Sequence, residues 1–187
     1  MDVESRDVAA FPKEDTRKLF YIQNYEWALK MTFRYLGEYE AAVATVHDTF
    51  LRLFQSKGEE VGLANRQSQP FDGERVKKIF VGAAVSAALQ RAEDTIPVHP
   101  EHARTYLREL VVCDNSGADL SKYRNAIAQV LSLPLYPRLA YNICVIESYS
   151  EDESATLLRI NKSEVAAHVQ TARTLLKNAM TAIDPDQ

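Results

Sequence analysis

The sequence predicts an all-α fold: two small helical domains joined by a connector, the C-terminal one a helix-turn-helix. The 187-residue chain is 46% hydrophobic and has only six glycines and seven prolines, which is typical of compact helices. Apolar residues recur three and four positions apart in several segments. Two helix-start signals also flank a short turn near the C-terminus. We place the first domain at 14–95, the connector at 96–117 and the second domain at 118–182.

Three helices are expected in the first domain. They cover about 15–36, 41–55 and part of 71–91, and Gly37 suits the left-handed cap of the first. The polar segment 57–70 is expected to be a loop. The residues predicted to form the buried sides of these helices are Leu19, Ile22, Ala28, Met31, Tyr35, Val43, Val46, Phe50, Leu53, Phe54, Val76, Ile79, Phe80, Ala83 and Ala87. We also assign to the core the aromatic residues Tyr21, Tyr25, Trp27, Phe33 and Tyr35.

The second domain opens with the segment 120–131 and continues with three helices between Pro134 and Met180, of which the last two form the helix-turn-helix. Ser150 and Glu153 form a Ser-x-x-Glu capping box, which predicts a helix that starts near Glu151 and ends near 159–160. Asn161 and Glu164 repeat the arrangement and predict a second helix from Lys162. We expect this second helix to bury one apolar stripe, made of Val165, Val169, Ala172 and Leu176.

The opposite face of that last helix is the candidate DNA-binding surface, since a helix of this kind enters the major groove. Two alanines there suit thymine methyl groups, and a glutamine suits adenine. The outward residues are Lys162, Ser163, Ala166, Ala167 and Gln170, with His168 and Arg173 toward the flanks.

Charge and composition exclude several classes of protein. The net charge of −4 does not fit a protein that holds nucleic acid by bulk attraction. It fits better a subunit whose partner supplies much of the nonspecific DNA affinity. A polar, acidic N-terminus and the lack of a long apolar run predict a cytoplasmic protein without membrane insertion. A stand-alone repressor would need a basic surface or a dimer interface, and neither is evident.

No enzyme, cofactor or metal signature is found. The sequence has no phosphate-binding glycine loop and no nucleophile elbow. Cys113 and Cys144 are read as small apolar residues, and a disulfide between them is not expected. His99 and His102 lack further ligands nearby in the sequence, so we expect no zinc site.

The run from Tyr141 to Lys177 resembles the C-terminal domain of extracytoplasmic-function (ECF) sigma factors of the sigma-70 family. The segment 35–54 resembles the part of sigma domain two that docks on the polymerase clamp, and 71–91 resembles the promoter-melting helix that follows. The C-terminal positions that carry the resemblance are Leu133, Pro134, Arg138, Tyr149, Ser150, Ala155, Leu158, Ile160, Val165, Ala172, Arg173 and Leu176.

The resemblance implies a transcription initiation factor whose partners are core RNA polymerase, promoter DNA and an anti-sigma factor. It implies that the first domain binds polymerase and opens the minus-ten element, while the second reads the minus-thirty-five element. The implied polymerase contacts are Asp48, Arg52, Leu53 and Phe54. The implied DNA contacts in the first domain are Asn65, Arg66, Arg75, Lys77 and Lys78.

Several positions depart from the family pattern and leave an alternative open. An acidic pair is replaced by Val43 and Ala44, and the usual turn glycine is Arg159. A tryptophan, an asparagine and an aspartate of the melting helix are replaced by Arg75, Gly82 and Ser86. Three positions in the last helix that are commonly lysine, serine and arginine are Ala166, Ala167 and His168. The alternative is a degenerate sigma-like decoy that binds an anti-sigma factor and does not initiate transcription.

Overall fold

A computed structural model describes residues 13–55, 73–93 and 120–183, and all regular structure within these ranges is helical. The all-α prediction is therefore confirmed. The helices are α1 (Lys13–Leu36), α2 (Tyr39–Gln55), α3 (Gly73–Glu93), α5 (Leu120–Leu131), α6 (Leu135–Tyr141), α7 (Glu151–Leu158) and α8 (Lys162–Ile183). A π-helical turn, Asn142–Ile146, continues α6.

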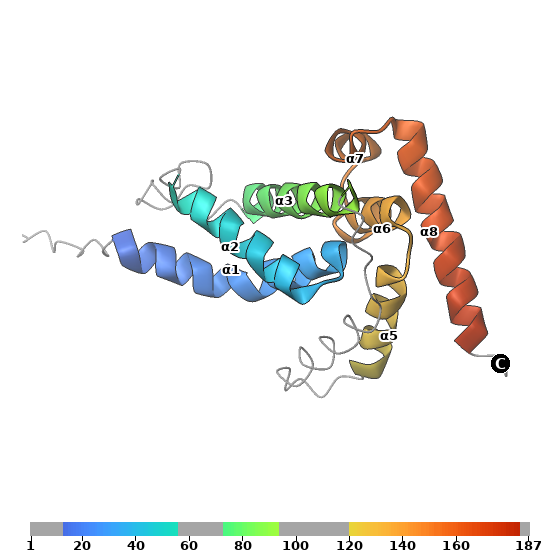
Figure 1. The fold of residues 1–187 in the computed structure, drawn as a ribbon, viewed down its shortest axis with the longest axis horizontal. Helices are drawn as coiled ribbons and strands as arrows, with labels where there is room; N and C mark the ends of the chain where they lie inside the picture. Colours follow the sequence, from blue (N-terminus) through green and yellow to red (C-terminus); the bar gives the residue numbers. More distant parts are fainter. Residues whose placement is uncertain (1–12, 56–72, 94–119, 184–187) are drawn as a thin grey trace, which may run out of the picture.

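The first three helices pack against one another in one part of the molecule (Figure 1). Gly37 ends α1 with φ of 72°, as its sequence position predicts. Aromatic rings fill the space between the helices: Phe50 of α2 lies 5.9 Å from Phe20 of α1 and 4.9 Å from Phe80 of α3, measured between ring centroids. Tilted and edge-on ring contacts of this kind stabilise a core beyond the area they bury.

The predicted buried side of α1 is partly wrong. Ala28, Met31 and Tyr35 are fully buried, but Leu19 is 57% exposed and Ile22 is 61% exposed. Phe20, which lies between them in the sequence, is fully buried against Phe50 of α2, so the buried side of α1 differs from the predicted stripe. Of the aromatic residues assigned to the core, Phe33 and Tyr35 are buried and Trp27 is 37% exposed. Tyr21 and Tyr25 are half-buried, and their stacked ring centroids lie 5.0 Å apart.

The remaining helices surround α6, and α8 forms the far edge of the molecule (Figure 1). Arg138 is almost wholly buried, and its guanidinium donates to the carbonyl oxygen of Leu131 at 3.0 Å. Burial lowers the pKa of Arg138 to about 10. This hydrogen bond fixes the corner between α5 and α6, and α6 in turn supports α8.

The two groups of helices share one buried apolar cluster, which extends from Phe20 in α1 to Val165 in α8. Helix α5 contacts α1, and α7 contacts α3. The predicted connector at 96–117 lies outside the described residues. The division into two domains therefore stays a prediction, while the contact between the helix groups is a feature of this structure.

Candidate nucleic-acid interface

Helices α7 and α8 begin with the two caps that the sequence predicts. The Ser150 hydroxyl accepts a hydrogen bond from the Glu153 amide at 3.2 Å, and the Glu153 carboxylate accepts from the Ser150 amide at 3.1 Å. At the second start, the Asn161 side chain accepts from the Glu164 amide at 2.9 Å, and the Glu164 carboxylate accepts from the Asn161 amide at 2.9 Å. Both helix starts are thus fixed by reciprocal hydrogen bonds.

The corner between α7 and α8 is made by Arg159, which has φ of 56° and ψ of 38°. A left-handed residue at a helix C-terminus is usually glycine, because a Cβ atom makes this conformation unfavourable. The amide of Ile160 donates to the carbonyl oxygen of Ala155 at 3.2 Å and closes the end of α7. The turn therefore forms with Arg159 at the position where the family that the sequence resembles usually has glycine.

The predicted outer face of α8 is exposed, while Val165 and Ala172 are fully buried and Val169 is half-buried. His168 differs from the other predicted contacts, because its ring stacks on Tyr136 of α6 with centroids 5.5 Å apart. Its side chain is half-buried against that helix. The exposed members of the predicted set are Lys162, Ser163, Ala166, Ala167, Gln170 and Arg173.

Lys162 is held by the start of α7. Its ammonium group donates to the Asp152 carboxylate at 3.0 Å and lies 4.0 Å from the Glu151 carboxylate. The hydrogen bond to Asp152 and the charge of that carboxylate raise the pKa of Lys162. An acidic helix start beside this face opposes a phosphate backbone. The consecutive acidic residues 151–153 are the signal of this in the sequence, where only the capping role of Glu153 is predicted.

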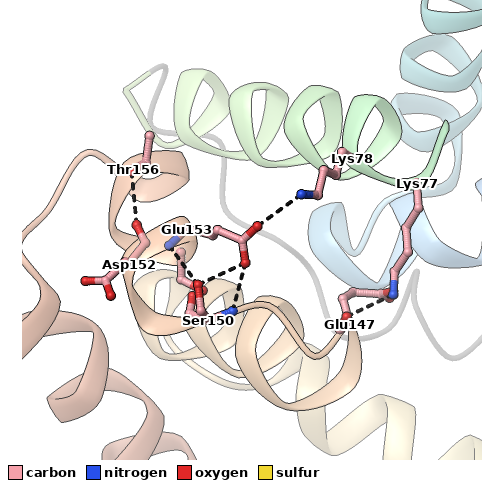
Figure 2. A network of polar contacts seen from close by, with 8 residues as sticks. Lys77, Lys78, Glu147, Ser150, Asp152, Glu153 and Thr156 are labelled. Atoms are coloured by element: carbon pink, nitrogen blue, oxygen red, sulfur yellow. Dashed lines mark hydrogen bonds and ion pairs between the residues drawn. The ribbon is translucent and has the colours of Figure 1, made fainter. Parts of the chain in front are cut away.

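Two further predicted DNA contacts, Lys77 and Lys78 of α3, meet the C-terminal helices (Figure 2). Lys77 is half-buried; its ammonium group donates to the carbonyl oxygen of Glu147 at 2.9 Å and lies 3.3 Å from the Glu147 carboxylate. The Lys78 ammonium group donates to the Glu153 carboxylate at 3.1 Å. Both lysines on this part of α3 are thus paired with carboxylates in this structure.

Glu147 is the centre of this contact and was missed by sequence analysis. Its side chain is only 6% exposed, and its carboxylate accepts from the guanidinium of Arg34 as well as facing Lys77. The Lys77 ammonium group also lies 5.8 Å from the centroid of the Tyr149 ring. Burial and the Glu147 charge raise the pKa of Tyr149 to about 12. Two cations offset the cost of burying one carboxylate here.

The candidate polymerase-binding residues on α2 divide into two kinds. Asp48 and Arg52 are exposed, and Phe50 is buried, as expected. Leu53 is 2% exposed, and Phe54 is half-buried with its ring 5.9 Å from that of Phe50. Asp48 and Arg52 can therefore contact a partner directly, while Leu53 and Phe54 pack α2 against its neighbouring helices.

Of the remaining residues singled out in the sequence, Arg75 lies within the described ranges and the others lie outside them. Arg75 is exposed near the start of α3. Asn65, Arg66, His99, His102 and Cys113 lie outside the described ranges.

Within the described ranges, no group of three or more histidine, cysteine or acidic side chains is arranged to hold a metal ion. Nor does any described helix combine the length and the apolar character needed to cross a membrane.

Neither a scan against models of known protein families nor a search of curated proteins finds a match to this chain.

Proposed function

We propose that this chain is a bacterial transcription initiation factor of the ECF sigma type, which binds core RNA polymerase and directs it to specific promoters. The observation that carries the proposal is the pair α7 and α8. Both helices begin with the caps that the sequence predicts, and the face of α8 suited to the major groove is exposed. The order of the apolar helices upstream, which resembles sigma domain two, supports the same function.

A specific observation favours a second candidate, the sigma-like decoy. Lys162, Lys77 and Lys78 are all paired with carboxylates of this chain. A protein whose few predicted phosphate contacts are neutralised internally would bind DNA weakly by itself. In a sigma factor this weakness is offset, because docking on polymerase raises the effective concentration of the second DNA-binding element. The two candidates therefore differ in one outcome: bound to core polymerase, a sigma factor initiates transcription at a promoter and a decoy does not.

Substitutions on α8 test the proposal. Lys162→Ala and Gln170→Ala should each weaken promoter-specific transcription by core polymerase by about 1 to 3 kcal/mol in apparent binding, if each residue contacts a base or a phosphate. Gln170→Ala should also relax the preference at one position of the minus-thirty-five element, whereas Lys162→Ala should weaken all promoters alike.

Lys18→Ala and Gln23→Ala are the matched controls, since both residues are exposed on α1, away from α8. They should leave the minus-thirty-five preference unchanged. Initiation that is equally efficient with both α8 substitutions would argue against base reading by this helix. A native protein that binds core polymerase yet starts at no promoter would favour the decoy.

A further inference from the structure

A cleft of about 470 Å³ lies between α3 and α7. Pockets for small organic molecules usually measure roughly 300 to 1,000 Å³. The exposed residues at this cleft are Ser86 and Gln90 of α3, Thr156 of α7, and Arg159 at the corner after α7. Thr156 is on the part of α7 that lies beside α3 (Figure 2). A small molecule can therefore enter from solvent without any movement of the helices.

Arg159 supplies the only charge among the described residues that line the cleft. The carboxylates at the start of α7 do not neutralise it, because Asp152 is paired with Lys162 and Glu153 is paired with Lys78. A guanidinium group binds a carboxylate or a phosphate through two parallel hydrogen bonds. The cleft therefore favours an anionic ligand.

The rest of the lining offers both polar and apolar contacts. The Ser86 hydroxyl and the Gln90 amide make no hydrogen bond to any other described residue, so both can bind polar atoms of a ligand. Leu89 and Leu157 are apolar walls. Gly82 adds room, because the nearest atom to a Cβ placed there is a methyl carbon of Leu157, at 4.0 Å. The cleft thus suits a molecule that joins one anionic group to a small apolar body.

The backbone at Arg159 favours glycine, yet the chain has arginine there. Its φ of 56° is left-handed, and glycine adopts this conformation without strain. The hydrogen bond that closes the turn joins backbone atoms of Ile160 and Ala155, so it does not require the arginine side chain. Strained residues concentrate at sites that bind ligands, where the side chain has a use that offsets the strain. Binding of an anion by the guanidinium is such a use.

Three of the positions that depart from the family pattern, which the sequence otherwise resembles, line this one cleft. Gly82 stands where asparagine is usual, Ser86 where aspartate is usual, and Arg159 where glycine is usual. Together these changes shorten two side chains, remove a carboxylate and add a guanidinium. They make the cleft larger and more positive than the family pattern does, as a site for an anion requires.

We propose that the cleft between α3 and α7 is a binding site for a small organic anion. Arg159 binds the anionic group, which is a carboxylate or a phosphate. Ser86 and Gln90 bind neighbouring polar atoms, and Leu89 and Leu157 pack against the apolar body. Such a site can exist in a sigma factor and in a decoy alike, so its test does not involve polymerase.

Phenyl phosphate and benzoate are suitable probes, because each joins one anionic group to a small apolar ring. Each probe is titrated into the full chain, and NMR follows the shifts of the Gly82 amide and of the Gln90 side-chain amide. At least one probe should bind saturably in the millimolar range, as is usual for a ligand of so few atoms, and the tighter one identifies the anionic group. Benzyl alcohol lacks the charge and inorganic phosphate lacks the ring, so each should bind at least about tenfold more weakly.

Two kinds of variant remove the site by different physical means. Arg159→Gln removes the charge and should weaken the tighter probe about tenfold, whereas Arg159→Lys keeps the charge and should lose less. Gly82→Leu fills the cleft and should also weaken binding about tenfold. Its control is Gly82→Ala, whose Cβ fits at 4.0 Å. Lys18→Gln removes one exposed charge from α1 and should bind like the native chain.

The absence of a saturable shift with both anions would overturn the site. Equal affinity for benzyl alcohol would overturn anion recognition, and so would unchanged binding by Arg159→Gln. A loss as large in Lys18→Gln as in Arg159→Gln would show attraction by net charge instead of a site. Thermal unfolding establishes that each variant is folded, and unchanged binding by folded Gly82→Leu would place the anion outside the cleft. If Gly82→Leu does not fold, the Arg159 and Lys18 variants decide.

Discussion

Glu153 has two roles in one side chain. It caps α7 together with Ser150, and it accepts a hydrogen bond from Lys78 of α3. The hydrogen bond from Lys78, followed by those from the backbone and hydroxyl of Ser150, lowers the pKa of Glu153 from 4.5 to about 2. A single carboxylate thus links the start of α7 to the contact between the helix groups.

This lowered pKa predicts how stability depends on pH. A carboxyl group whose pKa is lower in the folded state contributes its stability above the unfolded value, here near 4.5, and loses it as the pH falls toward 2. The native protein should therefore lose more stability over this range than Glu153→Gln. Thermal unfolding at several pH values and carbon NMR titration of Glu153 measure both effects. A Glu153 titration midpoint near 4.5 would contradict the assignment.

Arg159 predicts a stabilising substitution. Its left-handed conformation, with φ of 56°, costs an ordinary residue about 1 to 2 kcal/mol. Arg159→Gly should therefore raise the free energy of unfolding by about 1 kcal/mol. This net value is smaller than the strain removed, because glycine also gives the unfolded chain more conformational entropy. Arg159→Ala is the control, because alanine removes the side chain but keeps the strain. Equal stabilities of the glycine and alanine variants, measured by urea unfolding, would contradict this account.

Residues whose hydrogen-bond partners are close in the chain could be predicted from the sequence. Both caps pair residues three positions apart, and local hydrogen-bonding rules suffice to find them. Glu147 was missed because its partner Arg34 lies 113 residues away and Lys77 lies 70 residues away. No local pattern marks such a carboxylate as buried.

At the scale of elements, periodicity located the helices well. Helices α1 and α2 each begin two residues before their predicted starts, and the segment 120–131, predicted to open the second domain, is helix α5. The π-helical turn Asn142–Ile146 was not predicted, since it adds a residue to the turn and breaks the helical spacing. It is followed by Ser148, whose φ of 62° directs the chain toward the Ser150 cap.

The exposed charged face of α2 predicts a polymerase contact. Arg52→Glu should weaken co-purification with core polymerase, because it reverses a charge that lies exposed beside the buried Phe50. The change in stability should stay within about 0.5 kcal/mol, as is usual for surface substitutions. Lys18→Glu is the matched charge reversal on α1 and should leave co-purification intact. Polymerase binding that is equally strong in both variants would remove α2 from the proposed interface.

At the scale of the whole molecule, composition predicted an all-helical chain but not how its two groups of helices meet. The buried cluster runs through both groups, and the predicted DNA contacts on α3 lie against α7. Long-range packing of this kind depends on shape and charge across segments far apart in the sequence. Two of the DNA contacts predicted on α3, Lys77 and Lys78, are therefore paired in this structure with carboxylates of residues 147 and 153.

The most direct test of the proposed function is run-off transcription from a library of random upstream sequences, with purified core RNA polymerase and the native chain. The proposed sigma function predicts discrete start sites whose upstream sequences share a minus-ten and a minus-thirty-five element. It also predicts that Gln170→Ala alters only the minus-thirty-five element, because Gln170 lies exposed on α8. Binding of the chain to core polymerase without any discrete start site would contradict it.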